Sequence, residues 1–150
     1  MKKIYICYCG LYCENCAVKA KIEPAAQTLY EEMKNAGFAE IIHMIPGGSG
    51  FWPFLKEMAE TGTCVSCKGD GGNPGCAVRI CARAKGVEMC ALCESYPCPL
   101  FDEFFKNYPM LLNDNRLLAE KGLAAWAELQ DARRAEKYTY TDNKNIDLPS

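Results

Sequence analysis

The sequence predicts a mainly α-helical fold with irregular cysteine-rich loops and a short N-terminal strand. Three observations support this prediction. Apolar residues recur at the three- and four-residue spacing of helices in several segments. Eleven of the 150 residues are cysteines, and stretches rich in cysteine and glycine separate the helical patterns. The length suits one domain with a moderate core, so we expect a single domain over residues 1–138 and a flexible polar tail over residues 139–150.

Residues 3–9 are the first patterned segment, because apolar side chains alternate along them. A period of two is typical of a short strand. Alternate side chains of a strand point to opposite faces. The two faces would carry Ile4, Ile6 and Tyr8 on one side and Tyr5, Cys7 and Cys9 on the other.

Two helices are expected between this strand and the cysteine-dense segment at 64–98. Pro24 suits a first helical position and Gly37 suits a stop, which predicts a helix from about 24 to 36. A glycine-rich turn at 46–50 precedes a second helix, expected from Pro53 to Thr61.

Four more helices are expected in the rest of the chain. A short helix is predicted over 76–85, and another one follows Pro99. Segments 113–121 and 123–137 look like two C-terminal helices separated by Gly122. With the helix after Pro99 they make up a C-terminal helical part over 99–138. The wide apolar stripe of that helix consists of Leu100, Phe101, Phe104, Phe105 and Tyr108.

Neither the net charge nor any apolar segment of the sequence indicates a general affinity for nucleic acid or membranes. The formal net charge is -2, and the apolar stretch Ile4 to Ile6 is far shorter than the roughly 7–15 residues of a signal peptide core. No segment approaches the roughly 18 apolar residues of a membrane span. We therefore expect a cytoplasmic protein that binds neither nucleic acid nor membrane. Disulfides are rare in that compartment, and an odd cysteine count argues against a complete disulfide framework.

The cysteine spacing indicates metal binding. Three pairs have C-x-x-C spacing, namely Cys13/Cys16, Cys64/Cys67 and Cys90/Cys93. Such a turn points two thiolates at one ion, and several pairs in one cytosolic chain favour metal over buried structural thiols. The only histidine, His43, lies in an apolar stretch and is not expected to be a ligand.

Sequence neighbourhood suggests two zinc sites, although other groupings stay open. The most self-contained site would use Cys64, Cys67, Cys76 and Cys81, with Cys76 at or before the start of its helix. A second site could combine Cys13, Cys16, Cys90 and Cys93, leaving Cys9 and Cys98 as alternates or as part of a third centre. The expected fold is thus a small domain stabilised by zinc.

Two segments carry a family resemblance. The first is Tyr8-Cys9-Gly10-Leu11-Tyr12-Cys13-x-x-Cys16, and the second runs from Cys64-x-x-Cys67 through Cys76 and Cys81 to Lys85-Gly86-Val87-Glu88-x-Cys90-x-x-Cys93-x-x-Tyr96-Pro97-Cys98. Over about residues 5–108 the chain resembles the small cysteine-rich prokaryotic family known as domain-of-unknown-function family 3795. The resemblance implies zinc binding in a prokaryotic cytosol and supplies no activity. Cys7 lies outside the family pattern. The implied ligands are Cys9, Cys13, Cys16, Cys64, Cys67, Cys76, Cys81, Cys90, Cys93 and Cys98.

The function predicted from these observations is a structural zinc protein that presents a surface to a protein partner. Sites with four thiolates are closed, and closed zinc sites are usually structural. The alternative is an iron–sulfur protein with a redox or enzymatic role, since Cys9-x-x-x-Cys13-x-x-Cys16 has the spacing of radical S-adenosylmethionine enzymes. Asn15 replaces their usual aromatic residue, and the chain is too short for their barrel. Thiol redox chemistry, metal trafficking and a nucleic-acid-binding zinc ribbon are weaker hypotheses. No side chain is singled out as catalytic.

Overall fold

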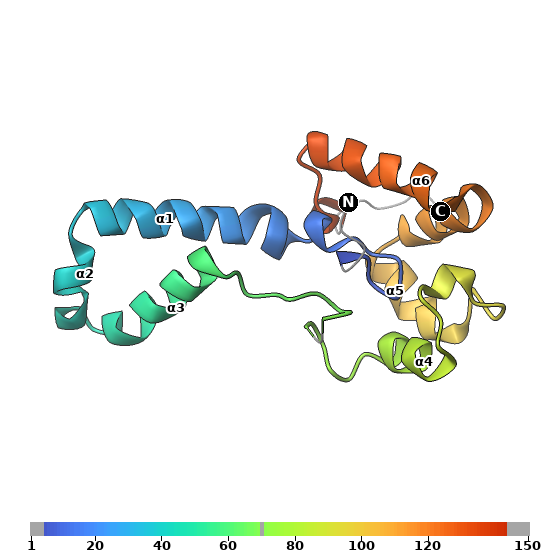
Figure 1. Cartoon of the computed structure of the whole chain (residues 1–150), viewed down its shortest axis with the longest axis horizontal. Helices are drawn as coiled ribbons and strands as arrows, with labels where there is room; N and C mark the ends of the chain where they lie inside the picture. The colour runs from blue at the N-terminus through green and yellow to red at the C-terminus, as the bar shows by residue number, and fades with distance from the viewer. Residues whose placement is uncertain (1–4, 70, 144–150) are drawn as a thin grey trace. The chain divides into compact units, whose positions relative to one another are not determined.

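The computed structural model describes residues 5–69 and 71–143. These residues are mostly helical and contain no β-strand, which confirms the mainly α fold class. The chain divides into two compact units (Figure 1). We call Ala17–Cys64 the hairpin unit, and the described residues of Met1–Cys16 and Val65–Ser150 the cysteine-rich unit. Each unit is described by itself.

The hairpin unit consists of two helices of equal length joined by short helical turns. Helices α1 (Glu23–Asn35) and α3 (Gly48–Glu60) lie side by side, as Figure 1 shows. Their core contains Ala26, Tyr30, Leu55 and Ala59, and the Tyr30 ring lies 5.1 Å from that of Trp52. The remaining elements are the π-helical turn η3 (Val18–Ile22), helix α2 (Phe38–Ile41) and the 3-10 turn η4 (Ile42–Met44).

The boundaries of α1 agree with the sequence prediction, whereas α3 begins five residues earlier than predicted. The expected start was Pro53, but the observed first residue is Gly48. Gly47 has a φ of 80° and its carbonyl accepts the Phe51 N–H at 3.1 Å, so the glycine turn itself forms the first helical turn. Pro53 then sits inside the helix, where its missing N–H removes a single backbone hydrogen bond.

The cysteine-rich unit is built from short helices followed by one long one. The long helix α6 (Leu111–Ala135) contains the expected break, because Gly122 has φ 81° and ψ 178°. The helix expected over 76–85 is α4 (Ala77–Lys85), with Cys76 as its N-cap as predicted. The helix expected after Pro99 is split into η6 (Pro99–Phe101) and α5 (Asp102–Asn107). The other elements are the 3-10 turns η2 (Cys13–Asn15), η5 (Cys90–Leu92) and η7 (Tyr140–Asn143).

The strand expected at residues 3–9 is replaced, over its described residues, by a single antiparallel bridge between Ile6 and Tyr12. Gly10 has a φ of 95° and reverses the chain, and the Cys7 N–H donates to the Leu11 carbonyl at 2.8 Å. The loop closes on itself before a ladder can extend. The alternating residues identified in the sequence therefore form a tight loop and not a strand. Residues 3 and 4 lie outside the described residues.

The core of the cysteine-rich unit contains two apolar clusters. One packs Ile6, Tyr12, Leu118 and Trp126 together, with the Tyr12 ring edge-on to Trp126 at 5.9 Å. The other surrounds the buried Phe101 and contains Cys9, Val78, Ala82, Cys90 and Leu111. Cysteines thus contribute directly to the second core.

The C-terminal end of the described chain packs into this unit. Tyr140 is buried, and its hydroxyl accepts the Tyr12 backbone N–H at 2.8 Å. Of the tail expected over 139–150, residues 144–150 lie outside the described residues. No helix within residues 5–69 and 71–143 has the length and apolar character that a membrane span needs.

Candidate metal centre

Four cysteines converge on one small cavity of the cysteine-rich unit. The cavity measures about 20 Å³, which is room for one water-sized sphere. Its walls also include Val78, Tyr96 and Phe101, so the surroundings of the thiols are mostly apolar. We call these four residues the Cys90 group, and they are Cys81, Cys90, Cys93 and Cys98.

Three elements position the Cys90 group. Cys81 lies on α4, and Cys98 is the N-cap of η6. Cys90 and Cys93 bracket η5, whose turn is closed by the Cys93 N–H donating to the Cys90 carbonyl at 2.9 Å. Such a turn lets both sulfurs of a C-x-x-C pair face the same ion.

Electrostatic interactions also connect the members of the Cys90 group. Burial, followed by the negative charges of Cys9, Cys81, Cys93 and Cys98, raises the pKa of Cys90 to about 12. The Lys85 ammonium donates to the Cys93 sulfur at 3.8 Å. A divalent metal among the four sulfurs would add positive charge next to Cys90, where burial and neighbouring negative charges disfavour the thiolate.

A second group of thiols surrounds Cys7. Its thiol is hydrogen-bonded to Cys13, with the two sulfurs 3.5 Å apart, and also to Cys67 and Cys9. These bonds and burial raise the pKa of Cys7. We call these four residues the Cys7 group, and they are Cys7, Cys9, Cys13 and Cys67.

The pKa of Cys67 is lowered to about 6, the opposite direction to Cys7. The largest cause is the hydrogen bond from the Cys7 thiol, which stabilises the Cys67 thiolate. Burial opposes the shift, while a backbone hydrogen bond from Tyr8 and the charges of Arg79 and Arg83 add to it.

Helix α6 holds the N-terminal cysteine loop in place. The Asn115 amide donates to the Cys9 carbonyl and to the Tyr96 hydroxyl, both at 2.9 Å. Gly10 packs against the same side chain, since a Cβ at this position would lie 1.9 Å from the Asn115 Oδ1. Asn115 thus joins the loop of the Cys7 group to the segment of the Cys90 group.

A buried polar network further along α6 supports the same loop. Asn15, between Cys13 and Cys16, donates to the Gln130 Oε1 at 2.8 Å. Gln130 donates to the Asp114 Oδ2 at 3.1 Å, and Arg133 makes a two-pronged ion pair with the same carboxylate. Asn15, which lies inside the cysteine motif, therefore has a structural role, because an aromatic residue at this position could not donate the hydrogen bond to Gln130.

The structure groups the predicted ligands differently from their sequence neighbourhood. Cys76 and Cys81 were expected to share a site, but residues five apart on a helix are about 140° apart around its axis. Cys81 therefore faces Cys90, Cys93 and Cys98. Cys13 lies beside Cys7, which in turn contacts Cys67, although the sequence suggested that Cys13 pairs with Cys90.

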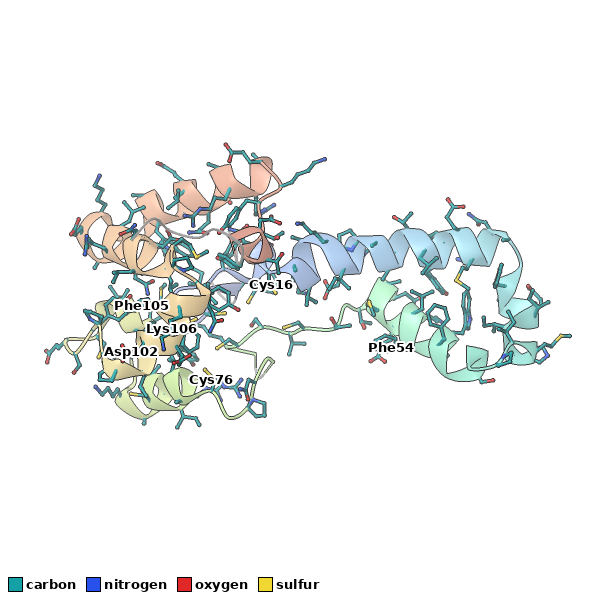
Figure 2. The ribbon with its side chains drawn as sticks, turned by 180° about the vertical axis from the view of Figure 1, so that it is seen from behind. Cys16, Phe54, Cys76, Asp102, Phe105 and Lys106 are labelled. Atoms are coloured by element: carbon teal, nitrogen blue, oxygen red, sulfur yellow. The ribbon has the colours of Figure 1, made fainter. Side chains whose placement is uncertain are left out.

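Three predicted ligands belong to neither group. Cys76 packs at the edge of the Phe101 cluster, and Cys16 follows η2 (both are labelled in Figure 2). Burial, followed by the charge of Cys16, raises the pKa of the Tyr108 hydroxyl. Cys64 is the last residue of the hairpin unit. Conversely, Cys7 was not among the predicted ligands. Its position two residues before Cys9, on the same face of the expected strand, was the signal that could have identified it.

The donor chemistry fits a thiophilic metal. No set of three or more His, Cys, Asp or Glu side chains in residues 5–69 and 71–143 is already arranged to hold a metal ion. Each group nevertheless contains four sulfur donors, the number and type that tetrahedral zinc takes. A cysteine sulfur is repositioned by rotation about χ1 alone, so closure of either group on an ion requires side-chain rotations.

One comparison with known proteins gives a match. The family model described as "Protein of unknown function (DUF3795)" matches residues 5–103, a range that includes all eleven cysteines. No curated protein and no solved structure matches the chain.

Proposed function

This chain belongs to the DUF3795 family of proteins of unknown function, and on that premise we propose that it is a zinc-binding protein whose thiolate sites are mainly structural. The observation that carries the proposal is the Cys90 group, in which three elements deliver four thiols to one cavity. Burial and the neighbouring negative charges disfavour the Cys90 thiolate, and a bound cation would offset both.

The residues proposed to hold the ion at this site are Cys81, Cys90, Cys93 and Cys98. Zinc takes four thiolates at about 2.3 Å and leaves no open position in such a site, which suits a structural role. A divalent ion with four thiolates carries a net charge of −2, and Lys85 lies beside Cys93 to offset part of it. The bound ion would tie α4, η5 and η6 together.

Magnitudes favour a role in stability. A structural zinc site contributes roughly 10–16 kcal/mol in small zinc peptides. A whole domain is stable by only about 5–15 kcal/mol. The short elements of the cysteine-rich unit would therefore depend on the metal for their fold.

The second half of the proposal is a surface for a protein partner. Most of the large exposed apolar side chains of the described residues belong to the hairpin unit. Met44 is 74 % exposed and Phe54, labelled on α3 in Figure 2, is 57 % exposed. Ile41 and Ile45 are exposed next to Met44 in sequence. Adjacent exposed apolar side chains mark interaction surfaces more often than isolated ones do.

Metal analysis of the full chain, purified without oxygen, tests the proposal. We expect zinc, no colour, and a visible thiolate–cobalt spectrum after replacement of zinc by Co²⁺. Cys93→Ser should lose one ion, whereas Leu92→Ser, a matched change of an exposed neighbour, should lose none. Brown protein containing iron and acid-labile sulfide would instead support the iron–sulfur alternative, which the all-thiol donor set also permits.

A further inference from the structure

The Cys7 group brings together cysteines from two distant segments of the cysteine-rich unit. Cys7, Cys9 and Cys13 come from the N-terminal loop, and Cys67 comes from the loop that precedes α4. Cys7 is in hydrogen-bonding contact with each of the other three. None of these four side chains belongs to the Cys90 group.

We propose that Cys7, Cys9, Cys13 and Cys67 bind a second zinc ion, or another thiophilic divalent cation, at a site separate from the Cys90 group. The inference uses the same thiolate chemistry as the proposed function and so rests on it. In a tetrahedral site with sulfurs about 2.3 Å from zinc, neighbouring sulfurs lie about 3.8 Å apart. The sulfurs of Cys7 and Cys13 lie 3.5 Å apart, so this pair needs little movement to share an ion.

Backbone hydrogen bonds hold both ligand-bearing loops. In the N-terminal loop the Gly10 N–H donates to the Cys7 carbonyl at 3.0 Å, beside the bond from Cys7 to Leu11. In the other loop Ser66 is buried next to Cys67, and its carbonyl accepts the Gly71 N–H at 2.6 Å. The ligands are thus presented by ordered turns, which lowers the entropy lost on binding an ion.

Positive side chains compensate the charge of such a site. Arg79 is only 6 % exposed and donates to the Gly71 carbonyl at 2.7 Å, in the loop that carries Cys67. The Lys68 ammonium lies 5.4 Å and the Arg83 guanidinium 5.9 Å from the ring centre of Tyr8, the residue between Cys7 and Cys9. A tetrathiolate–zinc centre has a net charge of −2, and these cations offset it.

Cys9 is the member that lies nearest to both groups. It contacts Cys7, and its charge also raises the pKa of Cys90. We assign Cys9 to the Cys7 group because the Cys90 group already has four thiols at its cavity. If the two sites are occupied separately, Cys9→Ser and Cys7→Ser should both lower the affinity for the same zinc ion.

The test is metal stoichiometry in the full-length protein. Cys7→Ser should reduce zinc from about two ions per chain to about one, and Cys93→Ser should do the same. The double variant should hold none. Val65→Ser, a matched control at an exposed residue next to the Cys67 loop, should keep both ions.

A second measurement on the wild-type chain remains informative if Cys7→Ser fails to fold. Zinc-loaded protein is treated with an alkylating reagent, and modified peptides are identified by mass spectrometry. We expect Cys7 to be protected by zinc and alkylated after chelation. Three results would overturn the second site and leave the Cys90 site standing. They are free alkylation of Cys7 in the zinc-loaded protein, a Cys7–Cys13 disulfide in protein purified without oxygen, and about two zinc ions per chain in Cys7→Ser. Wild-type protein without zinc would overturn both.

Discussion

The two units of this protein are stabilised in different ways. The hairpin unit packs two long helices through a few apolar side chains, and its single cysteine is its last residue. The cysteine-rich unit has the other ten cysteines, short elements, and side-chain hydrogen bonds that span more than 100 residues, such as Asn15–Gln130. Helices need only a neighbour for their apolar face. Loops need cross-links, and here buried polar bonds and thiol groups are the candidates.

Metal removal should produce the largest difference in stability between the two units. A chelator added to the full chain should expose the backbone amides of the cysteine-rich unit, α4 and η5 first, because the proposed sites supply about 10 kcal/mol or more each. The amides of α1 and α3 should keep most of their protection. Hydrogen exchange followed by mass spectrometry measures both units in one sample. Equal loss of protection in both, or no loss in either, would contradict the contrast.

The next largest effect should follow loss of the buried carboxylate in the cysteine-rich unit. Asp114→Ala leaves Arg133 and Gln130 without their partner in the interior. Breaking a buried ion pair from one side costs about 3–5 kcal/mol, so we expect a loss of that order in the unfolding free energy. Denaturant titration of the zinc-loaded protein measures it.

The matched control for this change is an exposed carboxylate on α5. Glu103 pairs with Lys106 at 2.7 Å, and both side chains are largely in solvent. Glu103→Ala should leave the unfolding midpoint unchanged, since exposed ion pairs contribute little. If the two variants behaved alike, the polar network around Asp114 would not be a main support of the unit.

In the hairpin unit the largest effect should come from apolar truncation. Leu55 is 3 % exposed and packs with Tyr30 and Ala59. Leu55→Ala should cost about 2–3 kcal/mol, toward the lower end for buried leucines because a pair of helices can partly collapse around the gap. Faster hydrogen exchange confined to α1 and α3 would locate the loss. A loss of bound zinc in this variant would contradict the view that the hairpin unit is stabilised independently of the metal.

The smallest effect on stability should follow a change in the exposed apolar surface. Met44→Ser replaces a side chain that is 74 % exposed, so the unfolding free energy should change by no more than about 0.5 kcal/mol. Retention on a hydrophobic-interaction column should nevertheless fall. A loss as large as that of Leu55→Ala would show that Met44 is covered in the folded protein and is not free to meet a partner.

Local sequence signals were sufficient for most helices and for the thiol-rich character of the chain. Pro24 and Gly37 mark the ends of α1, and Cys76 takes the N-cap position that its spacing to Cys81 indicated. These features depend on backbone preferences within one or two turns, which a few neighbouring residues determine. The C-x-x-C pairs likewise form tight turns at η2 and η5 from their own residues.

The composition of each thiol group depends on tertiary structure alone. Cys81 meets Cys90 because α4 turns that face toward η5, and Cys7 meets Cys67, a residue 60 positions further along the chain. Spacing along the sequence cannot determine such pairs, because packing of the intervening elements sets which sulfurs become neighbours. Cys7 illustrates the difference, since it has no C-x-x-C partner and yet contacts three other thiols once the loop at Gly10 closes. The sequence alone therefore determined that this is a helical, thiol-rich protein, and the tertiary structure decided which thiols lie together.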